Sequence, residues 1–280
     1  MAVILIVKTD GTRLKYDPNR IRATLKRIRA KNEVVDHIVQ NVTKQVHDGM
    51  TTMALFDLIR RELRKEDHCL SHRYNLRVGL QKLGPAGFLF EKYIAAVMRA
   101  YDYDAKLPEQ DLRGQCVDHE VDVVAHKQGR CVMIEAKFRN RFEDTVTLKD
   151  VLATWARFLD LAEGNRTGHC PKFDEVWIVT NGRFSDRARQ FGVCKDIRLV
   201  GWGPDEQSLT RLIDHAVVYP ITVLDDLRKW ELEKLFHREI LLCKDLAARK
   251  PGAIAKLLGV SLVRAEKIVW DAGEVVGEVG

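Results

Sequence analysis

Three side chains near the middle of the chain have the types and the spacing that phosphodiester hydrolysis requires. Glu135 follows Asp122 by thirteen positions, and Lys137 lies two residues further on. Carboxylates brought close together repel each other, and a hard divalent cation relieves that repulsion. We therefore predict that Asp122 and Glu135 bind Mg²⁺ or Mn²⁺. Lys137 would orient or activate the attacking water and stabilise charge in the transition state.

Two short strands are predicted to carry these residues, joined by a turn at residues 127–130. Apolar and polar residues alternate with period two on both sides of Gly129. The alternation puts Glu135 and Lys137 on one face of the second strand. It puts three acids on one face of the first strand: Asp118, Glu120 and Asp122. The alternative is that these are edge-strand charges that discourage aggregation.

The pattern Asp122…Glu135-Ala136-Lys137 resembles the PD-(D/E)XK nuclease superfamily, with Val121 in place of the Pro of the family name. Residues 177–184, with a helix expected after them, resemble the corresponding part of Mrr-like type IV restriction endonucleases. The resemblance implies a mixed sheet flanked by helices and metal-dependent hydrolysis of DNA. Many Mrr-like proteins place a Gln in the helix after the Lys, and no Gln occurs here between Lys137 and Thr180.

A helix is predicted over residues 88–101, with apolar residues at helical spacing on one side. Its start, Phe90-Glu91-Lys92-Tyr93, resembles the position at which nucleases of this superfamily carry a Glu that joins the metal site. Glu91 is therefore the fourth candidate catalytic residue, and the alternative is an ordinary helix-surface carboxylate near Lys92. Three further cations are candidate phosphate contacts or plain surface charges: Arg139, Lys149 and Arg157.

The N-terminal part of the chain carries the excess of positive charge, so it is the part expected to bind anions. The net charge of the whole chain is +6, but residues 1–84 alone carry 17 Lys and Arg against 9 Asp and Glu. The pattern there predicts a strand at residues 2–7, a turn at Asp10-Gly11, a second strand at residues 13–16 and then four helices, the last over residues 71–83. Asp17-Pro18 marks the start of the first helix, because Asp caps helices and Pro favours their first turn.

This N-terminal segment resembles the ATP-cone, the nucleotide-binding module of ribonucleotide reductases. The resemblance rests on Val7-Lys8-Thr9-Asp10-Gly11, Tyr16-Asp17-x-x-Arg20-Ile21, Gly49-x-x-Thr52 and Arg73-Tyr74-x-Leu76. It implies that ATP or dATP binds here, with Lys8 and Arg20 on the phosphates and Thr52 near the nucleotide. Thr9 replaces a usual Arg, and Phe56 stands where a His often lies. The alternative is a basic helical bundle with solvated charges.

Gly84-Pro85-Ala86-Gly87 breaks the fourth helix and predicts a hinge, so we expect domains at residues 1–84, 85–225 and 226–280. In the middle domain strands alternate with helices, which argues for an α/β fold with helices on both faces of the sheet. The last domain is expected to be helical. Around Gly259 it has a helix, turn and helix pattern resembling a helix-hairpin-helix unit, which would either hold DNA or pack against the body.

Composition limits the remaining possibilities. The six cysteines lack CxxC spacing, so we expect reduced thiols in a cytoplasmic protein, with a zinc site at Cys116 and His119 or at His169 and Cys170 disfavoured. No apolar stretch is long enough to span a membrane. No Walker A motif occurs, so a nucleotide should act by binding and not by being hydrolysed. It would then shift the helix over residues 88–101 or change the state of a homo-oligomer.

We therefore expect a metal-dependent DNA endonuclease regulated by ATP or dATP. The main rival is a catalytically inactive, nucleotide-sensing regulator that binds nucleic acid. A third hypothesis is a nucleotide-binding scaffold with no nucleic-acid partner. It draws support from residues 85–225, where 19 Lys and Arg face 22 Asp and Glu, since a surface that tracks phosphates is usually basic.

Overall fold

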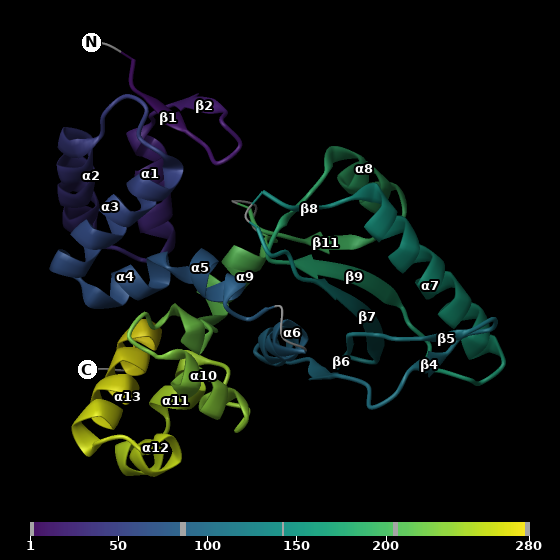
Figure 1. Ribbon diagram of the computed structural model, residues 1–280. Helices are drawn as coiled ribbons and strands as arrows, with labels where there is room; N and C mark the ends of the chain where they lie inside the picture. The colour runs from purple at the N-terminus through teal and green to yellow at the C-terminus, as the bar shows by residue number, and fades with distance from the viewer. Residues whose placement is uncertain (1–2, 85–87, 142, 204–206, 278–280) are drawn as a thin grey trace.

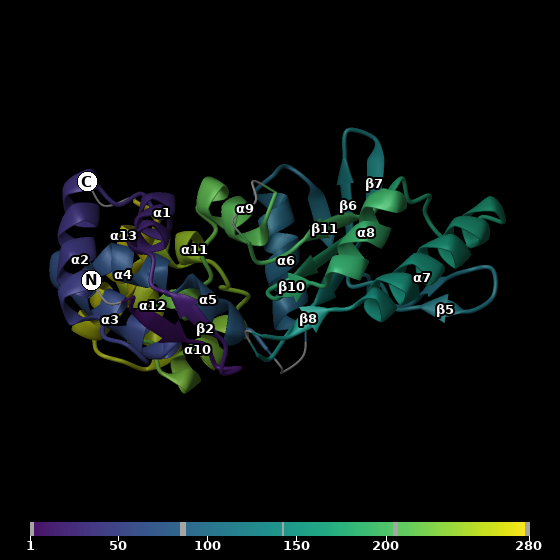
Figure 2. The ribbon, with the colours of Figure 1, turned by 90° about the horizontal axis from the view of Figure 1, so that it is seen from above.

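The computed structural model describes residues 3–84, 88–141, 143–203 and 207–277. The molecule has two lobes (Figures 1 and 2). One lobe contains the N-terminal hairpin and helices together with the C-terminal helices, and the other contains the central sheet. Helices α6 (Leu89–Arg99) and α9 (Leu209–Ala216) lie between the two. The overall α/β class and the order of hairpin, helices, mixed sheet and terminal helices agree with the prediction.

The N-terminal unit begins with an antiparallel hairpin, β1 (Leu5–Val7) and β2 (Arg13–Lys15). Its helices are α1 (Pro18–Arg27), α2 (Asn32–Gln45), α3 (Thr52–Glu66), α4 (His68–Tyr74) and α5 (Leu76–Gln81). Asp17 caps α1 by accepting from Asn19 N, as the sequence predicts. The single helix expected over residues 71–83 is instead two helices that meet at Asn75. The buried side chain of Asn75 donates to Val223 O and Asp225 Oδ1, which ties the break to the rest of the protein.

A five-stranded mixed sheet forms the second lobe, in the order β11-β9-β7-β6-β3. The strands are β3 (Asp104–Lys106), β6 (Val123–Lys127), β7 (Arg130–Lys137), β9 (Glu175–Thr180) and β11 (Arg198–Val200). β6 and β7 are the predicted antiparallel hairpin, and β9 and β11 continue the sheet in parallel. Gln128 and Gly129 both have positive φ, which is the backbone of a tight two-residue hairpin turn.

The two faces of the sheet bury different helices. Val132 and Ile134 of β7 belong to the core on the α6 side, whereas Cys131 and Met133 belong to the core shared with α7 (Leu148–Arg166) and α8 (Asp186–Cys194). The period-two alternation of the strand therefore determines what each residue faces. Glu135 has the parity of Met133 and so projects toward the α7 side.

The first predicted strand is shorter than the alternation implied. Asp118 lies in β5 (Asp118–His119), which pairs with β4 (Leu112–Arg113) outside the main sheet, and its carboxylate pairs with Arg113. β6 begins only at Val123. Asp118 therefore does not share a strand face with Asp122. A second small ladder, also not anticipated, joins β8 (Thr145–Val146) in parallel to β10 (Arg183–Phe184).

The C-terminal helices are α10 (Lys229–Phe236), α11 (Cys243–Ala247), α12 (Pro251–Leu258) and α13 (Leu262–Val276), preceded by the short 3₁₀ helix η1 (Ile221–Val223). Gly259 ends α12 with a positive φ of 74°, and Ser261 caps α13. These helices share one hydrophobic core with α6 and the adjacent face of the sheet. They also hold the N-terminal unit, because Arg73 Nε donates to Val275 O at 2.8 Å.

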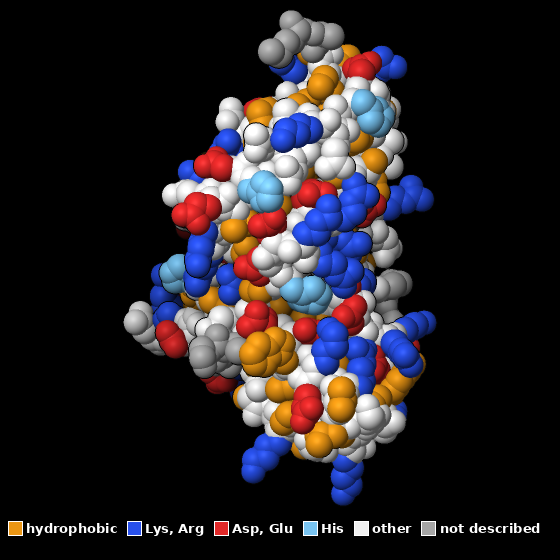
Figure 3. Space-filling model, turned by 90° about the vertical axis from the view of Figure 1, so that its left-hand side faces the viewer, with side chains coloured by type: hydrophobic (Ala, Val, Ile, Leu, Met, Phe, Trp, Pro, Cys, Tyr) orange, Lys and Arg blue, Asp and Glu red, His pale blue; other side chains and the backbone are white. Residues whose placement is uncertain are grey.

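The face shown in Figure 3 carries Lys and Arg side chains intermingled with Asp and Glu rather than one continuous basic surface. A purely electrostatic track for nucleic acid would require such a surface. Within the described ranges, none of the helices combines the length and the apolar character needed to cross a bilayer.

Candidate active site

The hairpin of β6 and β7 brings the predicted acids together at one end of the sheet. Val123 pairs with Ile134, so Asp122 lies beside the Glu135–Ala136 peptide. Asp122 Oδ2 accepts a hydrogen bond from Ala136 N at 2.6 Å. This bond fixes the Asp122 carboxylate against the strand that carries Glu135 and Lys137.

Glu135 is the most buried member of the site, with 3% of the residue exposed. One of its oxygens accepts from Lys137 Nζ and the other from Arg157 Nη1. A buried carboxylate is costly unless cations and hydrogen bonds compensate it, and these two side chains provide both. Arg157 comes from α7, so this helix completes the site from the face of the sheet toward which Glu135 projects.

Glu91 reaches the same site from α6. Burial raises the pKa of Glu91, and the negative charges of Glu120 and Glu135 raise it further while Lys137 opposes them. Glu120 is therefore a fourth carboxylate near the site, after Asp122, Glu135 and Glu91, although it is itself exposed. The sequence predicted that Glu120 and Asp122 share one face of a strand. Neither residue belongs to a strand, because β6 begins only at Val123.

Asp122 shows the electrostatic strain of this arrangement. Burial, followed by the charge of Glu135, raises the pKa of Asp122 to about 7, although the Ala136 amide and Lys137 favour the ionised form. Crowded carboxylates of this kind provide the oxygen ligands that Mg²⁺ and Mn²⁺ accept. The donor set therefore fits the predicted metal. The ligand oxygens of Glu91, Asp122 and Glu135 do not all lie within 4.8 Å of one another among the described residues.

The described residues do contain one tighter group of potential ligands, His68, His72 and Asp271, at the contact of α4 with α13. Cations already occupy two of its three members. Arg64 Nε donates to His68 Nε2 at 3.4 Å, and Lys267 Nζ donates to Asp271 Oδ2 at 2.6 Å. We therefore interpret this group as part of the contact between the N- and C-terminal helices.

The other candidate phosphate contacts lie outside the active site. Arg139 pairs with Asp150 at the start of α7, with 2.9 Å between Nη2 and Oδ2. Lys149 is exposed on the same helix. Of the pairs weighed as zinc ligands, Cys116 and His119 both contact Asp160, Cys116 through its backbone N at 2.9 Å and His119 through Nε2 at 2.8 Å, whereas His169 Nδ1 contacts Thr167.

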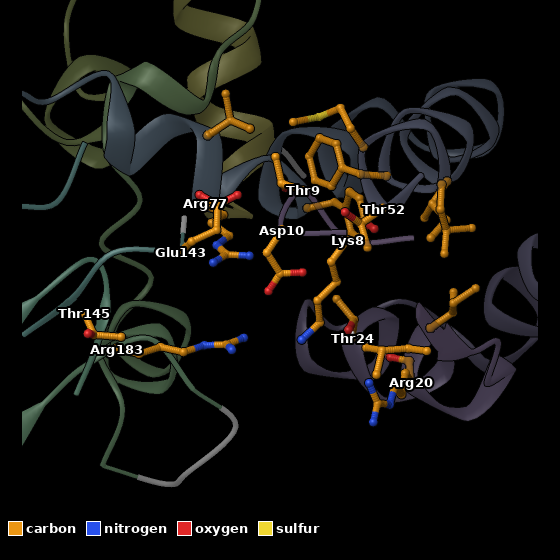
Figure 4. A pocket seen from close by; sticks show the side chains of 18 residues that line it. Lys8, Thr9, Asp10, Arg20, Thr24, Thr52, Arg77, Glu143, Thr145 and Arg183 are labelled. Atoms are coloured by element: carbon orange, nitrogen blue, oxygen red, sulfur yellow. Dashed lines mark hydrogen bonds between the residues drawn. The ribbon is translucent and has the colours of Figure 1, made fainter. Parts of the chain in front are cut away.

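The three residues predicted to bind a nucleotide line one cavity of about 500 Å³. Lys8 comes from the hairpin turn, Arg20 from α1 and Thr52 from the start of α3 (Figure 4). The apolar part of the wall includes Phe56 and Tyr74, whose rings stack with 4.9 Å between centroids. A planar base and a charged phosphate chain thus each have a matching part of the wall.

Residues that the sequence did not single out also line this cavity. Arg77 belongs to α5, and Glu143, Thr145 and Arg183 belong to the sheet lobe. Burial, together with the nearby charge of Arg183, lowers the pKa of Arg77 to about 10, while Glu143 opposes both. No local pattern identifies these residues, because each belongs to a segment remote in sequence from the hairpin turn.

Comparisons with known proteins divide the chain in the same way. Residues 4–74 match the ATP cone domain, residues 84–213 match a restriction endonuclease family, and residues 219–276 match the AF1548-like C-terminal domain.

Two relatives cover most of the chain. An uncharacterized protein of Archaeoglobus fulgidus is 32% identical over 167 residues, which are 59% of this chain and 90% of that protein. The crystal structure of AF1548, a protein of unknown function, superposes with a TM-score of 0.56 at 30% identity. That match covers 69% of this chain and all of AF1548.

Proposed function

Because this chain belongs to the family of AF1548 and the Archaeoglobus fulgidus relative, and joins an ATP cone to a restriction-endonuclease domain, we propose that it is a metal-dependent DNA endonuclease regulated by ATP or dATP. The observation that carries the proposal is the convergence of Asp122, Glu135 and Lys137 at one end of the sheet. That convergence lies within the residues matched to the endonuclease family.

The chemistry follows from the charges of the site. A bound Mg²⁺ or Mn²⁺ would supply Lewis-acid activation of the phosphodiester and a more acidic water. Asp122 and Glu135 would hold the metal, and Glu91 would assist from α6. Lys137, whose ammonium contacts Glu135, would orient the attacking water and offset the negative charge that develops on the phosphate.

Arg157 has a positioning role in this proposal. Its guanidinium binds the Glu135 oxygen that Lys137 does not contact. Glu135 is thereby held in one orientation from two sides. With Glu135 holding a metal, Arg157 would continue to stabilise the charge of this carboxylate, and Lys137 would be available to the substrate.

The N-terminal cavity supports a regulatory role for the nucleotide. Its walls combine cations with an apolar stack, which suits a purine nucleoside triphosphate. The sequence lacks a Walker A motif, so the nucleotide should act by binding. A ligand can change activity only if it binds two states with different affinities.

The alternative is a catalytically inactive regulator that binds nucleic acid and senses nucleotide. The acidic balance of residues 85–225, 19 Lys and Arg against 22 Asp and Glu, does not favour this alternative but a scaffold with no nucleic-acid partner, because a surface that tracks phosphates is usually basic. Under this alternative Lys137 and Arg157 would serve only to compensate Glu135.

Cleavage of supercoiled and branched DNA with Mg²⁺, Mn²⁺ or EDTA tests the proposal. Cleavage should require metal and disappear in Asp122→Ala, Glu135→Ala and Lys137→Ala, whereas binding of DNA persists. Lys195→Ala is the matched control, because this exposed lysine follows the end of α8 and is not among the candidate site residues. Metal-independent cleavage, or full cleavage by the Lys137 variant, would rule out this mechanism.

A further inference from the structure

The nucleotide cavity is built by two domains rather than by the ATP cone alone. The cone contributes the hairpin turn, α1 and α3, while Glu143, Thr145 and Arg183 come from the sheet lobe and Arg77 comes from α5. Figure 4 shows Lys8 and Arg20 on one side of the cavity and Arg77 and Arg183 on the other, with Asp10 between them. A ligand that fills this space must therefore touch both domains.

The sheet-lobe wall begins directly at the active site. Lys137, the last residue of β7, pairs with Thr180, the last residue of β9. Six residues beyond Lys137 the chain reaches Glu143, and three residues beyond Thr180 it reaches Arg183. The two segments then pair again, since Thr145 of β8 is the register partner of Arg183 of β10.

Side-chain bonds join these two segments into one unit. Asn181 Oδ1 accepts from Arg139 N at 2.7 Å, and Asn181 Nδ2 donates to Arg139 O at 2.9 Å. The unit is short and lies between Lys137 and the cavity. The pairing of β8 with β10 and the two hydrogen bonds between Asn181 and Arg139 hold its segments together. A displacement at Glu143 or Arg183 would consequently be transmitted toward the catalytic strand end.

Glu143 of the sheet lobe interacts with the cone across the cavity. A hydrogen bond from the Thr9 side chain, and then the positive charges of Arg77 and Arg141, lower the pKa of Glu143. Thr9 lies in the hairpin turn of the cone, so this carboxylate spans the domain boundary. Among the described lining residues the cations are Lys8, Arg20, Arg77 and Arg183, and the acids are Asp10 and Glu143.

The cavity thus has an excess of positive charge that Glu143 only partly offsets. A triphosphate carries more negative charge than one carboxylate and presents several oxygens to guanidinium groups. It would compete with Glu143 for Arg77, and it would also relieve the repulsion between Arg77 and Arg183.

We propose that a purine nucleoside triphosphate binds between the two domains, with Arg77 and Arg183 contacting its phosphates, and that it releases Glu143 from Arg77 and Thr9. The release moves residues 138–141 and 143–145, which follow Lys137 along the chain. This is the regulatory device of the nuclease, and it rests on the proposed function.

The same segment also reaches the remaining parts of the active site. The ring of Phe138 packs against Phe90, with 5.6 Å between centroids, and Phe90 precedes Glu91. It also fills the space beside Gly84, where an added Cβ would lie 2.3 Å from the ring. Coupling through residues 88–101, expected from the sequence, would therefore be indirect, because no described residue of α6 lines the cavity.

Two substitutions in the full-length protein test the proposal by calorimetry with ATP and dATP. Arg183→Ala should weaken nucleotide binding by at least about tenfold, the effect of losing a charge-assisted contact. Glu143→Gln should strengthen it several-fold, because the competing carboxylate is gone. Both side chains are exposed, so the fold should survive, and thermal melting checks this. Arg187→Ala is the matched control, since this exposed arginine on α8 does not line the cavity.

Cleavage and hydrogen exchange give the second readout. Nucleotide should change exchange in residues 138–145, and nucleotide-free Glu143→Gln should cleave DNA at a rate shifted toward that of the nucleotide-bound wild type. If the wild type binds nucleotide and cuts DNA but both variants behave as wild type does, the interdomain mechanism is wrong while the proposed function stands. If the wild type binds no purine triphosphate, the regulatory part of the proposed function is wrong as well.

Discussion

The active-site carboxylates should destabilise the metal-free protein, and replacing Asp122 by Asn measures this cost. Burial and the charge of Glu135 raise the pKa of Asp122 to about 7. The ionised carboxylate is therefore disfavoured in the folded state. Asn has nearly the same shape and keeps an oxygen that can accept from Ala136 N, as Asp122 Oδ2 does at 2.6 Å. The substitution thus removes the charge and preserves the contact.

The expected magnitude follows from the difference in pKa between the folded and unfolded states. Each pH unit of difference corresponds to about 1.36 kcal/mol. An aspartate that titrates at about 7 in the fold, rather than at 3.8, lowers the free energy of unfolding by about 4 kcal/mol once the pH exceeds both values. Because Glu135 and Glu91 share this repulsion, we expect Asp122→Asn to be about 2 to 4 kcal/mol more stable than the wild type at pH 8.

The sign of the pH dependence is fixed by the same pKa values. Between pH 3.8 and about 7 the folded wild type retains a proton on Asp122 that the unfolded chain has lost. The free energy of unfolding of the wild type should therefore fall, relative to the variant, as the pH rises through this window. Urea denaturation in EDTA at several pH values from 4.5 to 8 measures this difference in the free energy of unfolding between the wild type and the variant.

Asp118→Asn is the matched control for this experiment. Asp118 is an exposed acid that pairs with Arg113 at the surface, so its replacement should change the free energy of unfolding by no more than about 0.5 kcal/mol. An Asp122→Asn variant that is no more stable than the wild type at pH 8, or a gain that does not depend on pH, would refute the reasoning.

Three further predictions concern the charges around the site. Mg²⁺ or Mn²⁺ should raise the melting temperature of the wild type, because it relieves the repulsion between the Asp122 and Glu135 carboxylates, but should change that of Asp122→Asn little. Equal shifts of the two melting temperatures would argue against a metal at this site. Arg157→Met should lower cleavage at least about tenfold and lower the free energy of unfolding in urea by about 1 to 3 kcal/mol, since it leaves the buried Glu135 with one cation. Partial rescue of cleavage by Arg157→Lys would support a positioning role. Unchanged cleavage by Arg157→Met would exclude that role. Arg27→Met should make the N-terminal unit more sensitive to proteolysis, because it breaks the mostly buried pair with Asp214 of α9, which lies between the lobes. A digestion pattern identical to that of the wild type would show that this pair does not hold the N-terminal unit in place.

The sequence alone determined the features that depend on neighbours along the chain. Period-two alternation located the β6 and β7 hairpin, and Gly129 located its turn. Because side chains on a strand alternate strictly, the shared face of Glu135 and Lys137 followed as well. The resemblance to the ATP cone named Lys8, Arg20 and Thr52, and a hairpin turn and two helices hold all three at one cavity.

Alternation failed where the chain leaves the sheet. Asp118 obeys the same period as Asp122, yet it pairs with Arg113 in a separate ladder. A local pattern cannot distinguish one long strand from two short ones separated by a bend, because the choice depends on which partner strand supplies hydrogen bonds.

Only the tertiary structure decided which distant charges complete the two sites. The helical pattern of α7 does not distinguish Arg157 from an ordinary surface cation. Arg157 binds Glu135 because α7 packs on that face of the sheet. Arg77, Glu143 and Arg183 meet at the cavity because the N-terminal unit docks against the ends of β8 and β10. Charge interactions act through space over several ångströms whatever the separation along the chain, so the residues that tune a site are selected by domain packing, which no local spacing records.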